Sequence, residues 1–156
     1  MRSAHWILSF GGIGRLPGPS GTYASLATAA IVVALSSLGP PALAPAVLVA
    51  VAGGAVTTLL LGNGLASDGD SGDPSWVVTD EVAGQGVALM LAGLSPNRGL
   101  VTTLAAFALF RLFDIWKPGP VGRAERLPGG LGILADDLLA GAIAGVLTLG
   151  VGALLP

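Results

Sequence analysis

The sequence predicts an all-α integral membrane protein, a compact bundle of about four to five transmembrane helices with a short N-terminal interfacial or re-entrant segment. Composition is the first reason, because hydrophobic residues make up 53% of the chain and charged residues only 10%, whereas soluble domains carry about 25% charged residues. The mean hydropathy is +0.81. Glycine is also abundant within apolar runs, and Gly141 and Gly145 form a small-xxx-small pair that is typical of packed membrane helices. The length indicates a single domain, residues 1–156.

Five apolar segments approach the ~20 residues that a membrane-spanning helix needs. They cover residues 23–38, 43–61, 76–94, 100–116 and 131–155. The first two are uncharged and are joined by Gly-Pro-Pro-Ala, so we expect a helical hairpin. The opening stretch His-Trp-Ile-Leu-Ser-Phe is too short to span and is expected to lie at the interface or to re-enter. The N-terminus lacks the regions of a secretory signal, so we expect it to belong to the mature protein.

The basic residues predict the orientation. Five crossings place the N-terminus, the 62–75 loop and the 117–130 connector on one side of the membrane. That side carries Arg2, Arg15, Lys117, Arg123 and Arg126. On the other side stands Arg98 alone. Because cytoplasmic loops are enriched in Lys and Arg, we expect a multi-pass protein whose N-terminal side faces the cytoplasm.

Carboxylates from three predicted helices lie at the same predicted depth. Asp80 and Glu81 are within two turns of the cytoplasmic end of the third segment, and Asp114 is near that end of the fourth. Asp136 and Asp137 lie about two turns into the fifth segment, which begins on the same side. Since each helical residue advances ~1.5 Å along the axis, the sequence predicts five carboxylates together just below the cytoplasmic interface.

Buried acids of this kind need a cation beside them, because a charged side chain inside a bilayer costs roughly 2.5–3.5 kcal/mol on insertion scales. Oxygen ligands without His or Cys favour a hard divalent ion, Mg²⁺ above all, which also binds phosphate oxygens. Arg111 lies three residues before Asp114 on the same helical face, and it can either pair with that acid or bind a phosphate bidentately. The alternative for the acids is that each extends separately to water at the interface.

Several functional classes are excluded. His5 is the only histidine, which rules out lipid phosphatases that use a histidine nucleophile with a second histidine as acid, and gives no support to a Ser-His-Asp hydrolase. The Asp-Gly-x-x-Ala-Arg signature of membrane CDP-alcohol phosphotransferases is missing from the sequence. The chain has no cysteine, and its net charge of -2 argues against a nucleic-acid partner. Metal-and-carboxylate chemistry remains.

Three motifs follow one another along the chain: TDEVAGQGVALM, FALFRLFDIWKPGPV and GGLGILADDLLAGAIAGV. In this order, with an N-terminal Gly/Pro segment that ends in SGTYAS, the sequence resembles the phosphatidylglycerophosphatase A family over nearly its whole length. The resemblance implies a Mg²⁺-dependent phosphatase of the bacterial cytoplasmic membrane with its active site on the cytoplasmic side. It also implies the substrate, phosphatidylglycerophosphate, whose terminal phosphate is removed to give phosphatidylglycerol and inorganic phosphate.

The resemblance further implies roles for individual residues. The catalytic and metal-binding acids are Asp80, Glu81, Asp114, Asp136 and Asp137. The residues that bind the substrate phosphate are Arg111, Lys117 and Thr22. Two departures from the family pattern stand out: its Pro-Gly-Thr-x-Gly-Ser reads Ser-Gly-Thr-Tyr-Ala-Ser here, and Pro128 stands where the family can have a histidine. The first leaves the role of the N-terminal segment open, and the second suggests that this histidine is not needed for the chemistry.

Other functions stay open. Within the same class, the substrate can be another lipid phosphate, such as phosphatidic acid or a polyprenyl pyrophosphate. A small ion-coupled transporter also carries intramembrane acids, but it is expected to hold them near the midplane between repeated halves, and the sequence shows no repeat. A third alternative is a noncatalytic scaffold whose acids only pair with Arg111 and Lys117. The sequence also leaves open the number of metal ions, the attacking group and whether the chain forms an oligomer.

Overall fold

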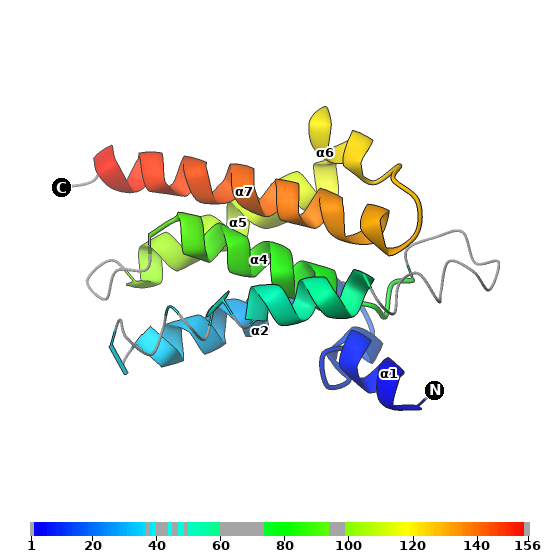
Figure 1. Cartoon of the computed structure of the whole chain (residues 1–156). Coiled ribbons are helices and arrows are strands. Elements are labelled where there is room, and N and C mark those ends of the chain that lie inside the picture. The colour runs from blue at the N-terminus through cyan, green and yellow to red at the C-terminus, as the bar shows by residue number, and fades with distance from the viewer. Residues whose placement is uncertain are drawn as a thin grey trace.

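The regular secondary structure of the described residues is helical. The structure, a computed structural model, describes residues 2–36, 38–39, 44, 47–48, 50–59, 74–93 and 99–154. Its helices are α1 (Arg2–Leu8), α2 (Ser20–Ser36), α4 (Thr79–Leu91), α5 (Gly99–Trp116), α6 (Pro120–Ala124) and α7 (Gly130–Leu154), with a short 3-10 turn at Ile13–Arg15 and a further helix at Ala50–Leu59. The long helices run side by side, and α4 lies between α7 and α2 (Figure 1).

Each of the five predicted apolar segments contains a helix, although the ends differ from the prediction. The helix α2 begins at Ser20, three residues before the predicted start. By contrast, α4 begins at Thr79 instead of residue 76. The backbone N–H groups of the two valines before it make other hydrogen bonds. The backbone N–H of Val77 donates to the carbonyl of Pro74, and that of Val78 donates to the carbonyl of Leu8. The short helix α6 in the 117–130 connector was not predicted.

Some predictions lie outside the described residues. These are most of the Gly-Pro-Pro-Ala turn, most of the 62–75 loop, Arg98, and the parts of the 43–61 segment on either side of the described helix. The same holds for the last residues of the 131–155 segment.

Small residues let α4 and α7 approach closely. A Cβ atom on Gly141 of α7 would lie 2.1 Å from the backbone oxygen of Gly84 on α4, and one on Gly145 would lie 2.7 Å from the backbone oxygen of Ala88. The predicted packing role of the Gly141 and Gly145 pair is therefore confirmed. Among the described residues, the largest fully buried side chain is Phe110 of α5, which lies next to this crossing at Gly84.

The described helices differ in whether they are long enough to cross a membrane. Among the described residues, one helix is long and apolar enough to cross a membrane by length and composition, at Gly130–Gly152. Two shorter apolar helices are found at Ser20–Leu35 and Ala50–Leu59. The predicted helical bundle is thus confirmed. That about four to five of its helices cross a membrane stays a prediction.

Candidate active site

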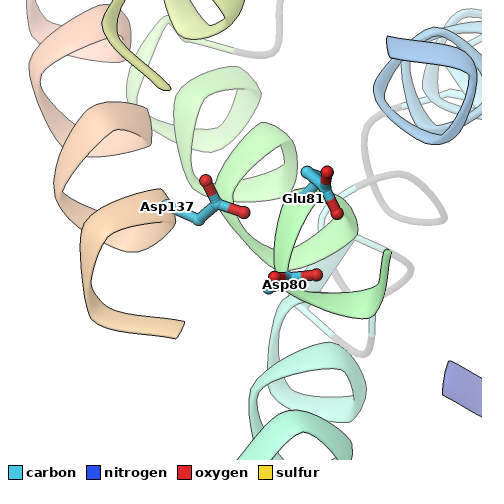
Figure 2. A group of neighbouring side chains, drawn as sticks. All are labelled: Asp80, Glu81 and Asp137. Atoms are coloured by element: carbon cyan, nitrogen blue, oxygen red, sulfur yellow. The ribbon is translucent and has the colours of Figure 1, made fainter. Parts of the chain in front are cut away.

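Five carboxylates from three helices meet at one end of the bundle. The first turn of α4 supplies Asp80 and Glu81, the last turn of α5 supplies Asp114, and α7 supplies Asp136 and Asp137. They form two groups, and within each group one oxygen from every residue lies within 4.8 Å of the others. The first group is Asp80, Glu81 and Asp137, and the second is Asp114, Asp136 and Asp137. Asp137 belongs to both, and Figure 2 shows it directed from α7 toward the first turn of α4.

The donor set fits a hard divalent cation. Asp80, Asp136 and Asp137 are each less than 5% exposed, and taking a carboxylate out of water costs several kcal/mol unless it is compensated. Among the described residues, Oε2 of Glu81 and Oδ1 of Asp136 are buried without a hydrogen-bond partner. Such oxygens are available as ligands, and ligand sets made of carboxylate oxygens suit Mg²⁺, Ca²⁺ or Mn²⁺ better than softer metals. These acids can therefore form a metal site.

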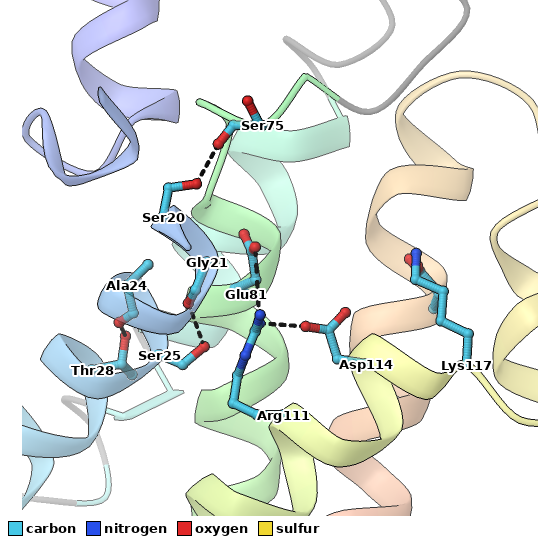
Figure 3. A network of polar contacts seen from close by, with 11 residues as sticks. Ser20, Gly21, Ala24, Ser25, Thr28, Ser75, Glu81, Arg111, Asp114 and Lys117 are labelled. Atoms are coloured by element: carbon cyan, nitrogen blue, oxygen red, sulfur yellow. Dashed lines mark hydrogen bonds and ion pairs between the residues drawn. The ribbon is translucent and has the colours of Figure 1, made fainter. Parts of the chain in front are cut away.

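Arg111 lies between the α4 acids and the α5 acid. Its Nη1 atom donates a hydrogen bond to Oδ2 of Asp114 and lies 4.0 Å from Oε1 of Glu81 (Figure 3). The pairing with Asp114, one of the two alternatives left open by the sequence, is thus present. Nε of the same guanidinium is buried and has no hydrogen-bond partner among the described residues. The side chain therefore keeps a donor for a further anion, and its role in phosphate binding stays a prediction.

Lys117 ends α5 and reaches back toward α7. Its φ of 48° lies in the left-handed region, which costs a residue other than glycine about 1–2 kcal/mol. In this conformation its Nζ atom donates to Oδ2 of Asp136 at 2.6 Å and to Oε1 of Glu125 at 2.7 Å. Partial burial lowers the pKa of Lys117, but the two hydrogen-bonded carboxylates outweigh it and raise the pKa above its ordinary value. Lys117 is therefore a fixed cation that compensates Asp136.

The start of α2 packs against Glu81 through a glycine. A Cβ atom on Gly21 would lie 1.8 Å from Oε1 of Glu81 and 3.2 Å from Nη1 of Arg111, so glycine leaves room for this carboxylate. Thr22 follows in the same turn and is partly buried. Its predicted part in phosphate binding stays a prediction.

Polar contacts hold the surroundings of the acids in place. The Oγ atom of Ser20 donates to the backbone oxygen of Ser75 (Figure 3). The hydroxyls of Thr58 and Thr79 lie 3.0 Å apart in a hydrogen bond that joins the Ala50–Leu59 helix to the start of α4. These contacts and Glu125 were not predicted from the sequence, because the contacts join residues that are distant in the sequence and Glu125 lies in a connector. The only available signal was the polar character of Thr58 and Ser20 within or beside apolar runs.

Comparison with known proteins identifies the family. A family model described as phosphatidylglycerophosphatase A matches residues 6–152, which is most of the chain. The chain belongs to the phosphatidylglycerophosphatase A family. The resemblance predicted from the three motifs is thereby confirmed.

Curated relatives support this membership over part of the chain. Proteins named phosphatidylglycerophosphatase A from Escherichia coli and Haemophilus influenzae are 39% and 46% identical over 77 and 69 residues. A Bacteroides thetaiotaomicron protein, whose name proposes a phosphatidylinositol-3-phosphatase, is 49% identical over 69 residues. These matches cover 48%, 44% and 44% of this chain, in that order, and 43%, 40% and 43% of the relatives. The chain thus matches less than half of the length of each relative. No significant match to a solved structure was found.

Proposed function

We propose that the protein is a Mg²⁺-dependent membrane phosphatase that hydrolyses the terminal phosphate monoester of phosphatidylglycerophosphate to phosphatidylglycerol and phosphate. The observation that carries this proposal is the pair of carboxylate groups that share Asp137, with Arg111 beside them. Membership of the phosphatidylglycerophosphatase A family supports the choice of substrate. The acids are too many and too buried for simple ion pairing with the two nearby cations. A divalent cation would offset part of the remaining negative charge and would attract a phosphate dianion.

The proposed role of each residue follows from its charge. All five acids would hold the cation, and bound Mg²⁺ supplies neutralisation of phosphate oxygens and activation of water. Arg111 binds a phosphate oxygen through the donor that its pairing with Asp114 leaves free, so the anion is held next to the acids. Lys117 orients Asp136 by its 2.6 Å hydrogen bond. In the overall reaction the oxygen of water forms a bond to phosphorus, and the bond from phosphorus to the glycerol oxygen breaks. That oxygen takes up a proton and leaves as the headgroup hydroxyl.

We propose that the long helices lie in a membrane and that this site lies near the membrane surface. Large apolar side chains are exposed on the outer sides of the long helices, including Leu104 and Leu112 on α5 and Val146 and Leu149 on α7, which suits contact with lipid. We infer a multi-pass protein of the bacterial cytoplasmic membrane, with the acids at the depth of the cytoplasmic headgroups. The excess of Lys and Arg on the side of the connector supports this orientation.

Single-cysteine labelling tests the orientation, because the chain has no cysteine of its own. Leu100→Cys, at the start of α5, is expected to react with a membrane-impermeant maleimide in intact spheroplasts. Arg126→Cys, in the connector before α7, is expected to react only after the membrane is opened. The reverse pattern would overturn the orientation, and reaction of both variants in intact cells would overturn the multi-pass arrangement.

The function is tested by phosphate release from the purified protein in mixed micelles. We expect release from phosphatidylglycerophosphate with Mg²⁺ and none with EDTA, because the acids then lack the cation that compensates them. Phosphatidic acid, phosphatidylinositol 3-phosphate and a polyprenyl pyrophosphate serve as competing substrates, since the first and last are alternatives from the sequence and the second appears in a relative's name. Faster release from one of these lipids would replace the proposed substrate. No release from any lipid by folded protein would favour the transporter or the scaffold.

A further inference from the structure

An apolar groove runs along the bundle beside the acids. It has a volume of about 330 Å³, within the range of pockets that bind small molecules. Its walls are α2, the Ala50–Leu59 helix and the start of α4, with Ile7 and Phe10 of the N-terminal segment beside them. None of the described residues that line it carries a charge. Apart from three threonines these residues are apolar or glycine, so the groove favours an apolar occupant.

Two helix faces form the sides of the groove. On α2 its lining runs from Thr28 to Leu35, and on the neighbouring helix it runs from Ala50 to Thr57. In both cases the lining residues follow helical spacing over seven positions, about 10 Å along the axis. A peptide helix of that length, about 10 Å across with its side chains, would need roughly 800 Å³. The groove therefore accommodates a linear chain but is too small for a peptide helix of the same length.

Glycine on the Ala50–Leu59 helix keeps the groove open. A Cβ atom on Gly53 would meet nothing within 4 Å, so no side chain of the described residues fills the space in front of it. Ile31, on the opposite wall, is 48% exposed, which indicates that the groove opens to the outside of the bundle. In a membrane, that outside is lipid.

One end of the groove adjoins the acids. Thr79 and Val82 belong to its lining, and they flank Asp80 and Glu81 in the first turn of α4. A molecule that filled the groove would therefore reach the same turn of α4 that carries these two carboxylates. The groove and the acids together match a ligand with a linear apolar part and an anionic head.

We propose that this groove binds one acyl chain of the lipid phosphate substrate while the phosphate lies among the acids. This inference rests on the proposed function and extends it, because it assigns a site to the apolar part of the substrate. The groove would orient the lipid and favour diacyl substrates over the free headgroup. Gly53 is then a residue that sets specificity, and it has no part in the chemistry.

The kinetic test fills the groove with a side chain. We expect Gly53→Leu to raise KM about tenfold for dioleoyl phosphatidylglycerophosphate, the size of effect that small changes of fit produce in apolar pockets, and to leave kcat/KM for the deacylated headgroup unchanged. Gly150→Leu is the matched control, because a Cβ atom there also meets nothing within 4 Å and α7 does not line the groove. The proposal is overturned if Gly53→Leu behaves like this control, or if it impairs the deacylated compound equally.

A binding measurement separates this inference from the proposed function. Phosphatidylglycerophosphate with a diazirine near the end of one acyl chain is photo-crosslinked to the protein in phosphatidylcholine nanodiscs, and the labelled peptides are mapped. We expect labelling within residues 28–35 and 50–57 that is suppressed by unlabelled phosphatidylglycerophosphate and by Gly53→Leu. This result would stand even if the wild-type protein released no phosphate. Labelling spread evenly over the lipid-facing helices would overturn the groove as an acyl site.

Discussion

Replacing Asp137 by asparagine is expected to lower phosphate release from phosphatidylglycerophosphate by at least ~10²–10³-fold, the range found when one charge-stabilising group is removed from an active site. Asp137 is the residue common to both carboxylate groups, so its loss weakens both at once. Asparagine has nearly the same shape but no charge, and its amide would direct N–H donors toward the cation. The measurement is kcat and KM in mixed micelles at saturating Mg²⁺.

The control for this variant is Asp70→Asn, which removes the same charge from the polar loop before α4. We expect this variant to retain wild-type activity, and the thermal unfolding midpoint of Asp137→Asn to remain at or above that of the wild type in EDTA. We expect no loss of stability in EDTA because a buried carboxylate without a cation is itself destabilising. Activity of Asp137→Asn within a few fold of wild type would contradict the shared site.

Replacing Gly141 by alanine is expected to destabilise the bundle by about 1–3 kcal/mol or more, as overpacking of a tight interface does. The added Cβ atom would lie 2.1 Å from the backbone oxygen of Gly84, and a backbone atom in the middle of a helix cannot turn aside as a side chain can. Because α4 and α7 carry four of the five acids, we also expect a loss of activity. The measurements are the thermal unfolding midpoint and phosphate release.

Gly150→Ala provides the matched comparison for this substitution. Gly150 also lies in α7, but a Cβ atom there meets nothing within 4 Å. Alanine favours a helix over glycine by up to about 1 kcal/mol, so this variant is expected to unfold at the same temperature as the wild type or higher. A lower unfolding midpoint for Gly141→Ala and an equal or higher one for Gly150→Ala would identify the helix crossing as the cause. Equal midpoints for both variants would show that α4 and α7 are farther apart than described.

Hydropathy was sufficient to predict the long helices, because long apolar runs have few other structures available to them. The ends were less predictable. The apolar run that begins at Trp76 suggested a helix three residues too early, since the N–H of Val78 is used in a contact with Leu8, some 70 positions away in the sequence. The helix α6 was missed although Pro120 at its start is a recognised signal. Five residues between glycines and prolines gave too weak a pattern.

The meeting of the acids was predictable because alternating helices bring residues at equal depth to one level. Their partners were harder to foresee. The sequence pointed to Arg111 and Asp114 as a pair by their spacing, but the ion pair of Lys117 with Asp136 spans 19 positions and depends on the left-handed turn after α5. Gly21 carried no recognisable signal, because its importance lies in the space that it leaves for Glu81.

The N-terminal segment is attached to the base of α4, and this determines where the protein tolerates additions. Leu8 accepts a hydrogen bond from Val78, and the ring of His5 stacks on that of Trp76 at 4.7 Å, both just before Asp80. An affinity tag or fluorescent fusion placed ahead of residue 2 would therefore act directly on the turn that carries two of the acids. The last turn of α7 offers a safer attachment point. Leu154 lies 17 positions beyond Asp137, about 25 Å along the helix, at the opposite end of the bundle from α1 (Figure 1).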